Sequence, residues 1–197
     1  MEMSFGLKAL STGEMLRAAV EGKTDLGQQV EEIMTSGDLV PDDLIVSMVA
    51  QKIMVPDCIN GVVLDGFPRT LVQAKLFENV LSEINLIIDL VILLKADDDT
   101  IINRTSGRFS CAKCGETYHK TSKPLTHEGM CDVCGGAQFR RRADDNLKAI
   151  QRRLNDYHIL TEPLLPFFQK KNILKSVDAT AEISDLKHEI NLLMNTL

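Results

Sequence analysis

The stretch GVVLDGFPR, residues 61–69, decides the class of fold. Val62 to Leu64 is a short apolar run with the β-branched content of a buried strand, and Gly66 marks the turn that ends it. Arg69 therefore follows the carboxyl end of a strand, where open α/β sheets bind ligands, and an arginine there can grip a phosphate with two hydrogen bonds. A surface arginine without function is the competing interpretation, and the position after the strand favours phosphate binding.

Three further runs have the pattern of buried strands, and segments with helical periodicity separate them. The strands are expected at 7–10, 90–94 and 173–177, and the helices at 14–20, 26–35, 42–53, 71–81, 100–105, 146–168 and 183–194. Ser11-Thr12-Gly13-Glu14 adds the spacing of a helix N-cap with a glutamate three positions on. Apolar strands that alternate with helices predict an α/β fold, a doubly wound parallel sheet covered on both faces.

The composition limits the classes of partner. A chain of 197 residues with 44% hydrophobic content can form one domain, and the net charge of -6 disfavours a general nucleic-acid or anionic-membrane surface. Seven of the nine arginines nevertheless lie between positions 104 and 153, which favours a specific anionic ligand. There is neither an apolar stretch of membrane-spanning length nor a secretory signal pattern, so we expect a cytoplasmic protein.

Four of the five cysteines form a metal-binding pattern. Cys111 and Cys114 are separated by two residues, sixteen residues follow, and Cys131 and Cys134 repeat the spacing. Two such pairs place four thiolates around one ion as in a zinc ribbon, and a site with four protein ligands is structural. A nucleic-acid-reading ribbon and four unligated thiols are weaker alternatives. Cys58 has no such partner and is expected to be a buried free thiol.

The arginines around this insert form the third signal. Arg142 and Arg153 lie eleven residues apart, so they can share a helix face if the helix begins early. A solvated charged face paired with nearby aspartates is the simpler interpretation for any one arginine. For Arg104, Arg108, Arg142 and Arg153 together, we favour a clamp on several phosphates.

These motifs together resemble adenylate kinase, in its long-lid bacterial type with a zinc-binding lid. The resemblance runs from about residue 5 to the C-terminus, with the motifs in the expected order. It rests on the following segments: LSTGEMLR (10–17), GDLV (37–40), LDGFPRT (64–70) with Gln73, Gly107-Arg108, the four-cysteine insert with Tyr118-His119, Arg142-Ala143-Asp144-Asp145, and RLNDY (153–157).

The resemblance implies the activity, the ligands and the domains. The reaction would be the reversible transfer ATP + AMP = 2 ADP, in adenine nucleotide homeostasis, with Mg²⁺ accompanying ATP and Zn²⁺ in the lid. Such a transfer requires positioning and charge stabilisation more than covalent chemistry, which suits a cluster of arginines. Residues 1–107 and 143–197 would form the core, with an AMP-binding region at 11–41, and residues 108–142 would form a lid with hinges near Gly107 and Asp144. We expect a monomer.

The resemblance also implies roles for individual residues. The catalytic set would be Arg69, Arg104, Arg108, Arg142 and Arg153, with Asp65 orienting water on the metal. AMP would be bound by Thr12, Arg17, Asp38, Leu39, Val40, Gly66, Phe67, Pro68, Arg69, Gln73, Arg142 and Arg153, with Gln73 reading the adenine. ATP would be bound by Arg104, Arg108, Thr117, Tyr118 and the backbone of Ala181. The zinc ligands would be Cys111, Cys114, Cys131 and Cys134.

One departure from the family pattern concerns its first segment. The 197 residues contain no apolar strand followed by a glycine-rich phosphate loop with its lysine. The loss of such an electrostatic element typically costs about 10²–10³ in rate, and a missing central strand would leave two unpaired edges in the sheet. Residues 2–6 stand where the family's first helix would run into its second strand, so we expect a longer natural product, which the DNA upstream of Met1 would test.

Three functions are therefore compared. The first is an active adenylate kinase, and the second is a relative that keeps AMP binding and the zinc lid but cannot hold ATP productively. The third, a zinc-ribbon nucleic-acid binder, is disfavoured by the acidic chain. A neighbouring nucleoside monophosphate as acceptor is left open, and the resemblance at Thr12 and Gln73 favours AMP.

Overall fold

The computed structural model describes residues 5–197, so residues 2–4 of the expected helix-to-strand segment lie outside the described part. The elements in order are β1 (Lys8–Ser11), α2 (Thr12–Glu21), α3 (Asp25–Ser36), α4 (Asp42–Ile53), the 3₁₀ turn η1 (Pro56–Cys58), β2 (Val62–Asp65), α5 (Leu71–Glu83), β3 (Val91–Lys95), α6 (Asp98–Ser106), β4 (Arg108–Cys111), β5 (Thr117–His119), β6 (Phe139–Arg140), α7 (Leu147–Asp156), the π turn η2 (Tyr157–Thr161), the 3₁₀ turn η3 (Glu162–Leu164), α8 (Leu165–Lys170), β7 (Leu174–Asp178) and α9 (Ile183–Met194).

The four expected strands are present and pair in parallel, which confirms the α/β class. β1 pairs with β2, with Leu10 opposite Leu64, and β3 pairs with β7, with Leu94 opposite Val177. Within residues 5–197 the two pairs are separate two-stranded sheets.

The expected helix over residues 146–168 is only partly right. The backbone stays helical, but the α-helix α7 ends at Asp156 and gives way to the turns η2 and η3 before α8 begins. Pro163 contributes to the change because proline has no N–H for a helical hydrogen bond. The Thr161 hydroxyl in the π turn donates to the Arg69 carbonyl at 2.8 Å, which ties this helix to the loop after β2.

A hydrophobic core lies around β1 and β2 and under α3, α4 and α5. Its members include Val30, Val49 and Phe77, all almost completely buried. A smaller cluster beside β3 contains Ala74, Leu164 and Phe168, so the α7–α8 segment packs against α5 as well as the second strand pair. The helices therefore cover the strands and hold their carboxyl ends in fixed positions.

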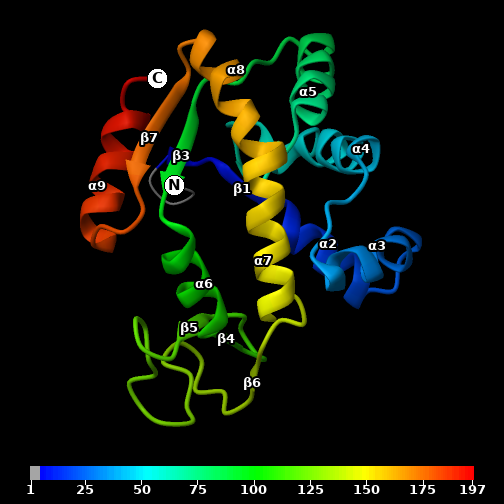
Figure 1. The fold of residues 1–197 in the computed structure, drawn as a ribbon. Helices are drawn as coiled ribbons and strands as arrows, with labels where there is room; N and C mark the ends of the chain where they lie inside the picture. Colours follow the sequence, from blue (N-terminus) through cyan, green and yellow to red (C-terminus); the bar gives the residue numbers. More distant parts are fainter. Residues whose placement is uncertain (1–4) are drawn as a thin grey trace.

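The segment 108–140 forms a third, antiparallel sheet in the order β5-β4-β6. Phe109 lies opposite Tyr118, and Cys111 lies opposite Phe139. Figure 1 shows this sheet at the ends of α6 and α7 that lie far from β3, β7 and α8. Among the helices of the described residues, none combines the length and apolar character needed to cross a bilayer.

Candidate functional site

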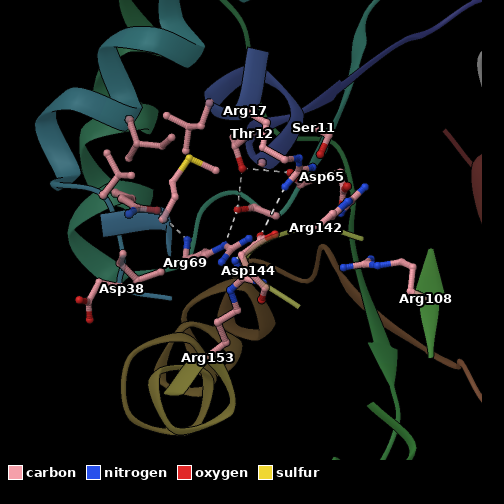
Figure 2. Close-up of a pocket in the computed structure, with 18 residues that line it drawn as sticks. Ser11, Thr12, Arg17, Asp38, Asp65, Arg69, Arg108, Arg142, Asp144 and Arg153 are labelled. Atoms are coloured by element: carbon pink, nitrogen blue, oxygen red, sulfur yellow. Dashed lines mark hydrogen bonds and ion pairs between the residues drawn. The ribbon is translucent and has the colours of Figure 1, made fainter. Parts of the chain in front are cut away.

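A cavity of about 240 Å³ opens at the carboxyl ends of β1 and β2. Its walls come from these strand ends, from α2 and α3, from the loops after α3 and β2, and from β4 and α7 (Figure 2). The lining residues are Ser11, Thr12, Gly13, Leu16, Arg17, Met34, Asp38, Leu39, Val40, Ile45, Asp65, Gly66, Arg69, Gln73, Arg108, Arg142, Asp144 and Arg153.

The cavity brings together most of the residues expected to bind AMP. Ten of them line it: Thr12, Arg17, Asp38, Leu39, Val40, Gly66, Arg69, Gln73, Arg142 and Arg153. Phe67 and Pro68 do not, and the Phe67 ring is instead buried in the core, with its centroid 5.1 Å from that of Phe77. Of the other expected residues, Arg108 and Asp65 line the cavity, whereas Arg104, Thr117, Tyr118 and Ala181 lie elsewhere.

Thr12 joins α2 to the loop after β2. Its side chain is 3% exposed, and its hydroxyl lies 3.3 Å from the Asp65 carbonyl and 3.2 Å from the Gly66 carbonyl. Ser11 occupies the N-cap position of α2 without a side-chain capping bond, so the expected cap is present in position only. The polar residues at this helix start therefore serve the cavity rather than the helix.

Gly66 is required by the geometry of this loop. Its φ angle is +73°, a conformation that L side chains rarely adopt, and a Cβ atom there would lie 2.8 Å from Arg69 Nη2. The Arg69 Nε donates to the Gly66 carbonyl at 2.8 Å. The turn thus folds back on the guanidinium and fixes it at the cavity wall.

Two arginines in the cavity lack a carboxylate partner. Within residues 5–197, neither Arg69 nor Arg142 forms an ion pair. The pKa of Arg69 is lowered by burial and by the nearby charge of Arg153, and the pKa of Arg142 is lowered by burial and by Arg108 and Arg17. The cavity therefore has an excess of positive charge that an anion of several charges would stabilise.

Two aspartates hold the remaining arginines. Asp144 Oδ2 accepts from Arg153 Nη2 at 2.5 Å and lies 3.8 Å from Arg17 Nη1, and Asp145 binds Arg108 through two hydrogen bonds of 2.9 and 2.6 Å. In Figure 2, the side chains of Arg17, Arg69 and Arg153 approach Asp144 from different elements. Burial raises the pKa of Asp144, but the hydrogen bond from Arg153 and the charge of Arg17 outweigh it and lower the pKa overall.

The sequence indicates the pairing of these arginines with aspartates but not the burial of the pairs. Pairing of the arginines with aspartates was the simple interpretation of the charged segment, but on a solvated face. Asp144 is instead 6% exposed and lines the cavity. Arg142 precedes α7, which begins at Leu147, so it reaches the cavity from the loop and not from a shared helix face with Arg153. The sequence signal for these ion pairs was the position of Asp144 and Asp145 directly after the run of arginines.

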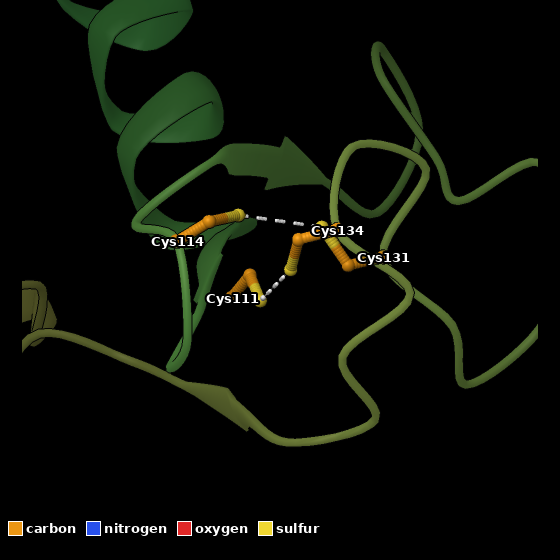
Figure 3. Close-up of side chains that lie close together, drawn as sticks. All are labelled: Cys111, Cys114, Cys131 and Cys134. Carbon is orange, nitrogen blue, oxygen red and sulfur yellow. Dashed lines mark hydrogen bonds between the residues drawn. The ribbon is translucent and has the colours of Figure 1, made fainter.

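The four cysteines converge at one point of the β5-β4-β6 segment (Figure 3). All four Sγ atoms lie within 4.8 Å of one another, with 3.6 Å between Cys111 and Cys134 and also between Cys114 and Cys131. Four thiolates at a zinc–sulfur distance of about 2.3 Å would place their sulfurs about 3.8 Å apart in a tetrahedron. The donor set and spacing therefore fit a closed zinc site.

The Tyr118 hydroxyl supports one of these thiols. Tyr118 is 1% exposed, and its hydroxyl lies 3.3 Å from Cys131 Sγ while it accepts from the Asp132 N–H at 2.9 Å. The hydroxyl beside Cys131 lowers the pKa of that thiol to about 6, which favours the thiolate that a metal requires. The ring packs with those of Phe109 and Phe139 in a small aromatic cluster, so the Tyr118 side chain is enclosed within the segment.

Comparison with known proteins gives one consistent result. Residues 1–173 match the family model described as adenylate kinase. The chain is 42% identical over 192 residues to an adenylate kinase of Rhizobium etli, which covers 98% of this chain and 89% of the relative. It is 40% identical over 186 residues to an adenylate kinase of Zymomonas mobilis (94% and 83% covered) and 41% identical over 182 residues to one of Carboxydothermus hydrogenoformans (92% and 85% covered).

Proposed function

We propose that the arginine-lined cavity is the AMP site of a phosphotransferase, from the premise that the chain belongs to the adenylate kinase family. Its function is the reversible transfer of a phosphoryl group from ATP to AMP, and members of this family use Mg²⁺ with ATP. The observation that carries the assignment of the site is the pair of half-buried arginines without a carboxylate partner among the described residues, Arg69 and Arg142, beside the groups expected to hold a nucleotide.

The cavity wall divides into two functional parts. The arginines Arg17, Arg69, Arg142 and Arg153 would surround the phosphate, and Gln73 with the loop at Asp38, Leu39 and Val40 would surround the base and ribose. Asp144 would hold Arg153 and Arg17 in place until the phosphate arrives. Since the phosphate oxygen of AMP is already ionised, these residues need only orient it and stabilise the developing charge.

The ATP side would be formed by residues outside this cavity. Arg104 Nη1 donates to the Ala179 carbonyl at 2.6 Å, which places the guanidinium beside the loop that contains Ala181. Arg108, at the first position of β4, is held by Asp145 and reaches the cavity from residues 108–142, which we call the lid segment. We propose that Arg104 and Arg108 bind ATP phosphates, with further contacts at Thr117 and Tyr118 and a backbone contact at Ala181. Asp65, at the end of β2, would orient water bound to Mg²⁺.

Residues 108–142 are proposed to be a lid that excludes water from the transfer. Water must be kept out because it would accept the phosphoryl group in place of AMP. The four cysteines would hold Zn²⁺, which would make the lid rigid without taking part in the reaction. Residues 1–107 and 143–197 would form the core, with the AMP-binding region at 11–41. A cytoplasmic location and a monomeric state also stay predictions.

A binding and turnover experiment tests the proposal. The chain is titrated with AMP by calorimetry and assayed for ADP formation from ATP and AMP, in parallel with Arg142→Met. The matched control is Arg141→Met, because Arg141 is exposed and does not line the cavity. We expect Arg142→Met to weaken AMP binding about tenfold to a hundredfold, from the loss of charged hydrogen bonds, and Arg141→Met to bind normally.

Each outcome separates the candidate functions. ADP formation with AMP binding supports the proposal, whereas AMP binding without turnover supports the alternative of a relative that keeps only the acceptor site. Equal AMP affinity in Arg142→Met, Arg141→Met and the unmodified chain would contradict the assignment of this cavity.

A further inference from the structure

The side-chain amide of Gln73 is held from both sides. Gln73 lies in the first turn of α5, lines the cavity and is 2% exposed. Its Oε1 accepts from the backbone N–H of Arg69 at 2.7 Å, and its Nε2 donates to Oδ1 of Asp42 at 2.8 Å. Asp42 is the first residue of α4, so the amide is fixed by one group from the loop after β2 and one from a separate helix.

These two partners determine which way the amide faces. A glutamine amide can rotate by half a turn and exchange its oxygen and nitrogen at little cost when its neighbours allow both. A backbone N–H can only donate, and an ionised carboxylate can only accept. The oxygen must therefore face Arg69 and the nitrogen must face Asp42. In the rotated amide, the Gln73 N–H would face the Arg69 N–H and the Gln73 oxygen would face the Asp42 carboxylate, so neither pair could form a hydrogen bond.

Asp42 also orients the hydroxyl of Thr70. This hydroxyl donates to the same Asp42 Oδ1 at 3.0 Å and accepts from the Gln73 N–H at 3.0 Å, which caps α5. Since the carboxylate takes the hydroxyl hydrogen, a lone pair of the hydroxyl is left for the Gln73 N–H. Asp42 thus fixes both ends of Gln73, the side-chain amide directly and the backbone through Thr70.

We propose that Asp42 is a positioning residue that sets the purine preference of the acceptor site through Gln73. The side-chain amide can form four hydrogen bonds, and partners among the described residues take two of them, which leaves one Oε1 lone pair and one Nε2 hydrogen. Adenine offers a donor at its 6-amino group and an acceptor at N1, and the fixed amide can meet both. Hypoxanthine reverses this pattern with a 6-oxo acceptor and an N1–H donor, and only the rotated amide would match it.

The inference rests on the proposed function, in which Gln73 meets the adenine of AMP. A purely structural role for Asp42 is the alternative, because an acidic residue in the first turn of a helix stabilises that helix. Asp43 separates the two roles. It lies in the same first turn of α4 and is exposed, and its side chain forms no hydrogen bond or ion pair with another described residue.

The test measures the affinities of the full chain for AMP and for inosine monophosphate by calorimetry. Four proteins are compared: the unmodified chain, Asp42→Ala, Asp42→Asn and the control Asp43→Ala. We expect the unmodified chain to bind AMP at least about tenfold more tightly than inosine monophosphate, since a polar site rejects a ligand that reverses its hydrogen bonds. We expect Asp42→Ala to narrow this ratio about fivefold or more, mainly through weaker AMP binding.

Asp42→Asn should narrow the ratio less than Asp42→Ala, because its amide oxygen can still accept from Gln73 but its nitrogen permits the rotated arrangement. Asp43→Ala should leave the ratio unchanged. Thermal melting of each variant monitors folding, and Asp42→Asn keeps the shape of the side chain if Asp42→Ala does not fold.

Two outcomes would overturn the inference in distinguishable ways. If the Asp42 variants lose affinity for both nucleotides by the same factor, the role of Asp42 is structural and the proposed AMP site is unaffected. If the unmodified chain binds both nucleotides equally, or neither, the assignment of Gln73 to adenine fails and the inference fails with it.

Discussion

The sheet formed by β4, β5 and β6 and the core around β1 and β2 are stabilised in different ways. The core around β1 and β2 has twelve buried apolar residues, whereas the cluster in the lid segment has three, namely Cys111, Tyr118 and Cys131. Two of these three are proposed metal ligands. A module of this size buries too little apolar surface to fold by itself, so we expect a metal held by the four cysteines to supply the missing stability. The two regions should therefore respond differently to the same perturbations.

Loss of the metal should have the largest effect, and only in the lid segment. In Cys131→Ser, or after chelation, we expect the amides of residues 108–140 to lose their protection against hydrogen exchange while those of β1 and β2 keep it. Structural zinc contributes about 10–16 kcal/mol of binding free energy in small modules, which the aromatic cluster cannot replace. Hydrogen-exchange mass spectrometry with metal analysis measures both regions at once.

Cys58→Ser is the matched control, because Cys58 is also buried but lies in the core around β1 and β2, outside the four-cysteine cluster. It should leave the metal content unchanged. Equal loss of protection in both regions of Cys131→Ser would show that the lid segment is not an independent unit.

A cavity in the core should have the second largest effect, and it should spare the metal site. Phe77→Ala removes a ring that is 1% exposed and packs edge-on against Phe67, and we expect the free energy of unfolding to fall by about 3–5 kcal/mol. Denaturant unfolding measures the loss, and the zinc content should stay at one ion per chain because the cysteines lie in another cluster. Phe77→Leu should lower the free energy of unfolding by less, since it removes less volume. Loss of zinc from Phe77→Ala under native conditions would contradict the separation of the two regions.

Asp144, at the junction of the two regions, should have a smaller effect with a defined pH dependence. Asp144→Asn removes the charge that accepts from Arg153, and we expect the free energy of unfolding at neutral pH to fall by about 1.5–3 kcal/mol. The pKa of Asp144 is lowered in the folded state, so its contribution is present above the ordinary value of about 3.8 and is lost as pH falls through the folded pKa. Denaturant unfolding from pH 7 downward should show a shallower acid loss in the variant.

Asp57→Asn is the control for this measurement, because Asp57 is exposed and forms no ion pair with another described residue. An acid profile of Asp144→Asn that follows the unmodified chain would remove Asp144 from the groups that link folding to pH.

The parallel strand pairs and most of the helices were predictable because they have a local signal, whereas β4, β5 and β6 have none. The runs that became β2 and β3 are short and almost wholly apolar, and the four cysteines have a spacing with few interpretations. The end of α7 at Asp156 was missed because hydrophobic periodicity continues through the segment and does not show the long-range bond from Thr161 to the carbonyl of Arg69. Local patterns thus determine the elements but not where tertiary contacts alter them.

The candidate site was predictable where residues follow a strand or belong to a motif, as for Thr12 and Arg69. It was not predictable where a residue acts through another. Asp42 lies 31 positions from Gln73, and nothing in the sequence relates the two. The burial of Asp144 was also missed, because a run of charged residues ordinarily indicates a solvated face and only the packing of α7 against the cavity excludes water there.

The smallest expected effect concerns His158 in the π turn η2, which contacts α6, the helix that leads into the lid segment. Its Nε2 lies 3.1 Å from Asp98 Oδ2 in α6, and its Nδ1 lies 3.3 Å from Glu162 Oε2. Hydrogen bonds to Asp98 and then to Glu162 raise the pKa of His158. A raised pKa means that the contribution to stability is fully present below the unfolded value of about 6.5 and is lost as pH rises through the folded pKa.

We therefore expect the melting temperature of the unmodified chain to fall more steeply than that of His158→Gln as the pH rises above about 6.5. The difference should be small because all three side chains are exposed to solvent, and it should shrink further in about 1 M salt, which screens exposed charges. His127→Gln is the control, since His127 lies in the lid segment and forms no ion pair with another described residue. If hydrogen exchange shows that protection is lost at high pH only in α6 and the π turn, the contacts of His158 stabilise these two elements alone. If the melting temperatures of the unmodified chain and His158→Gln depend on pH in the same way, the charge of His158 does not couple α6 to the π turn.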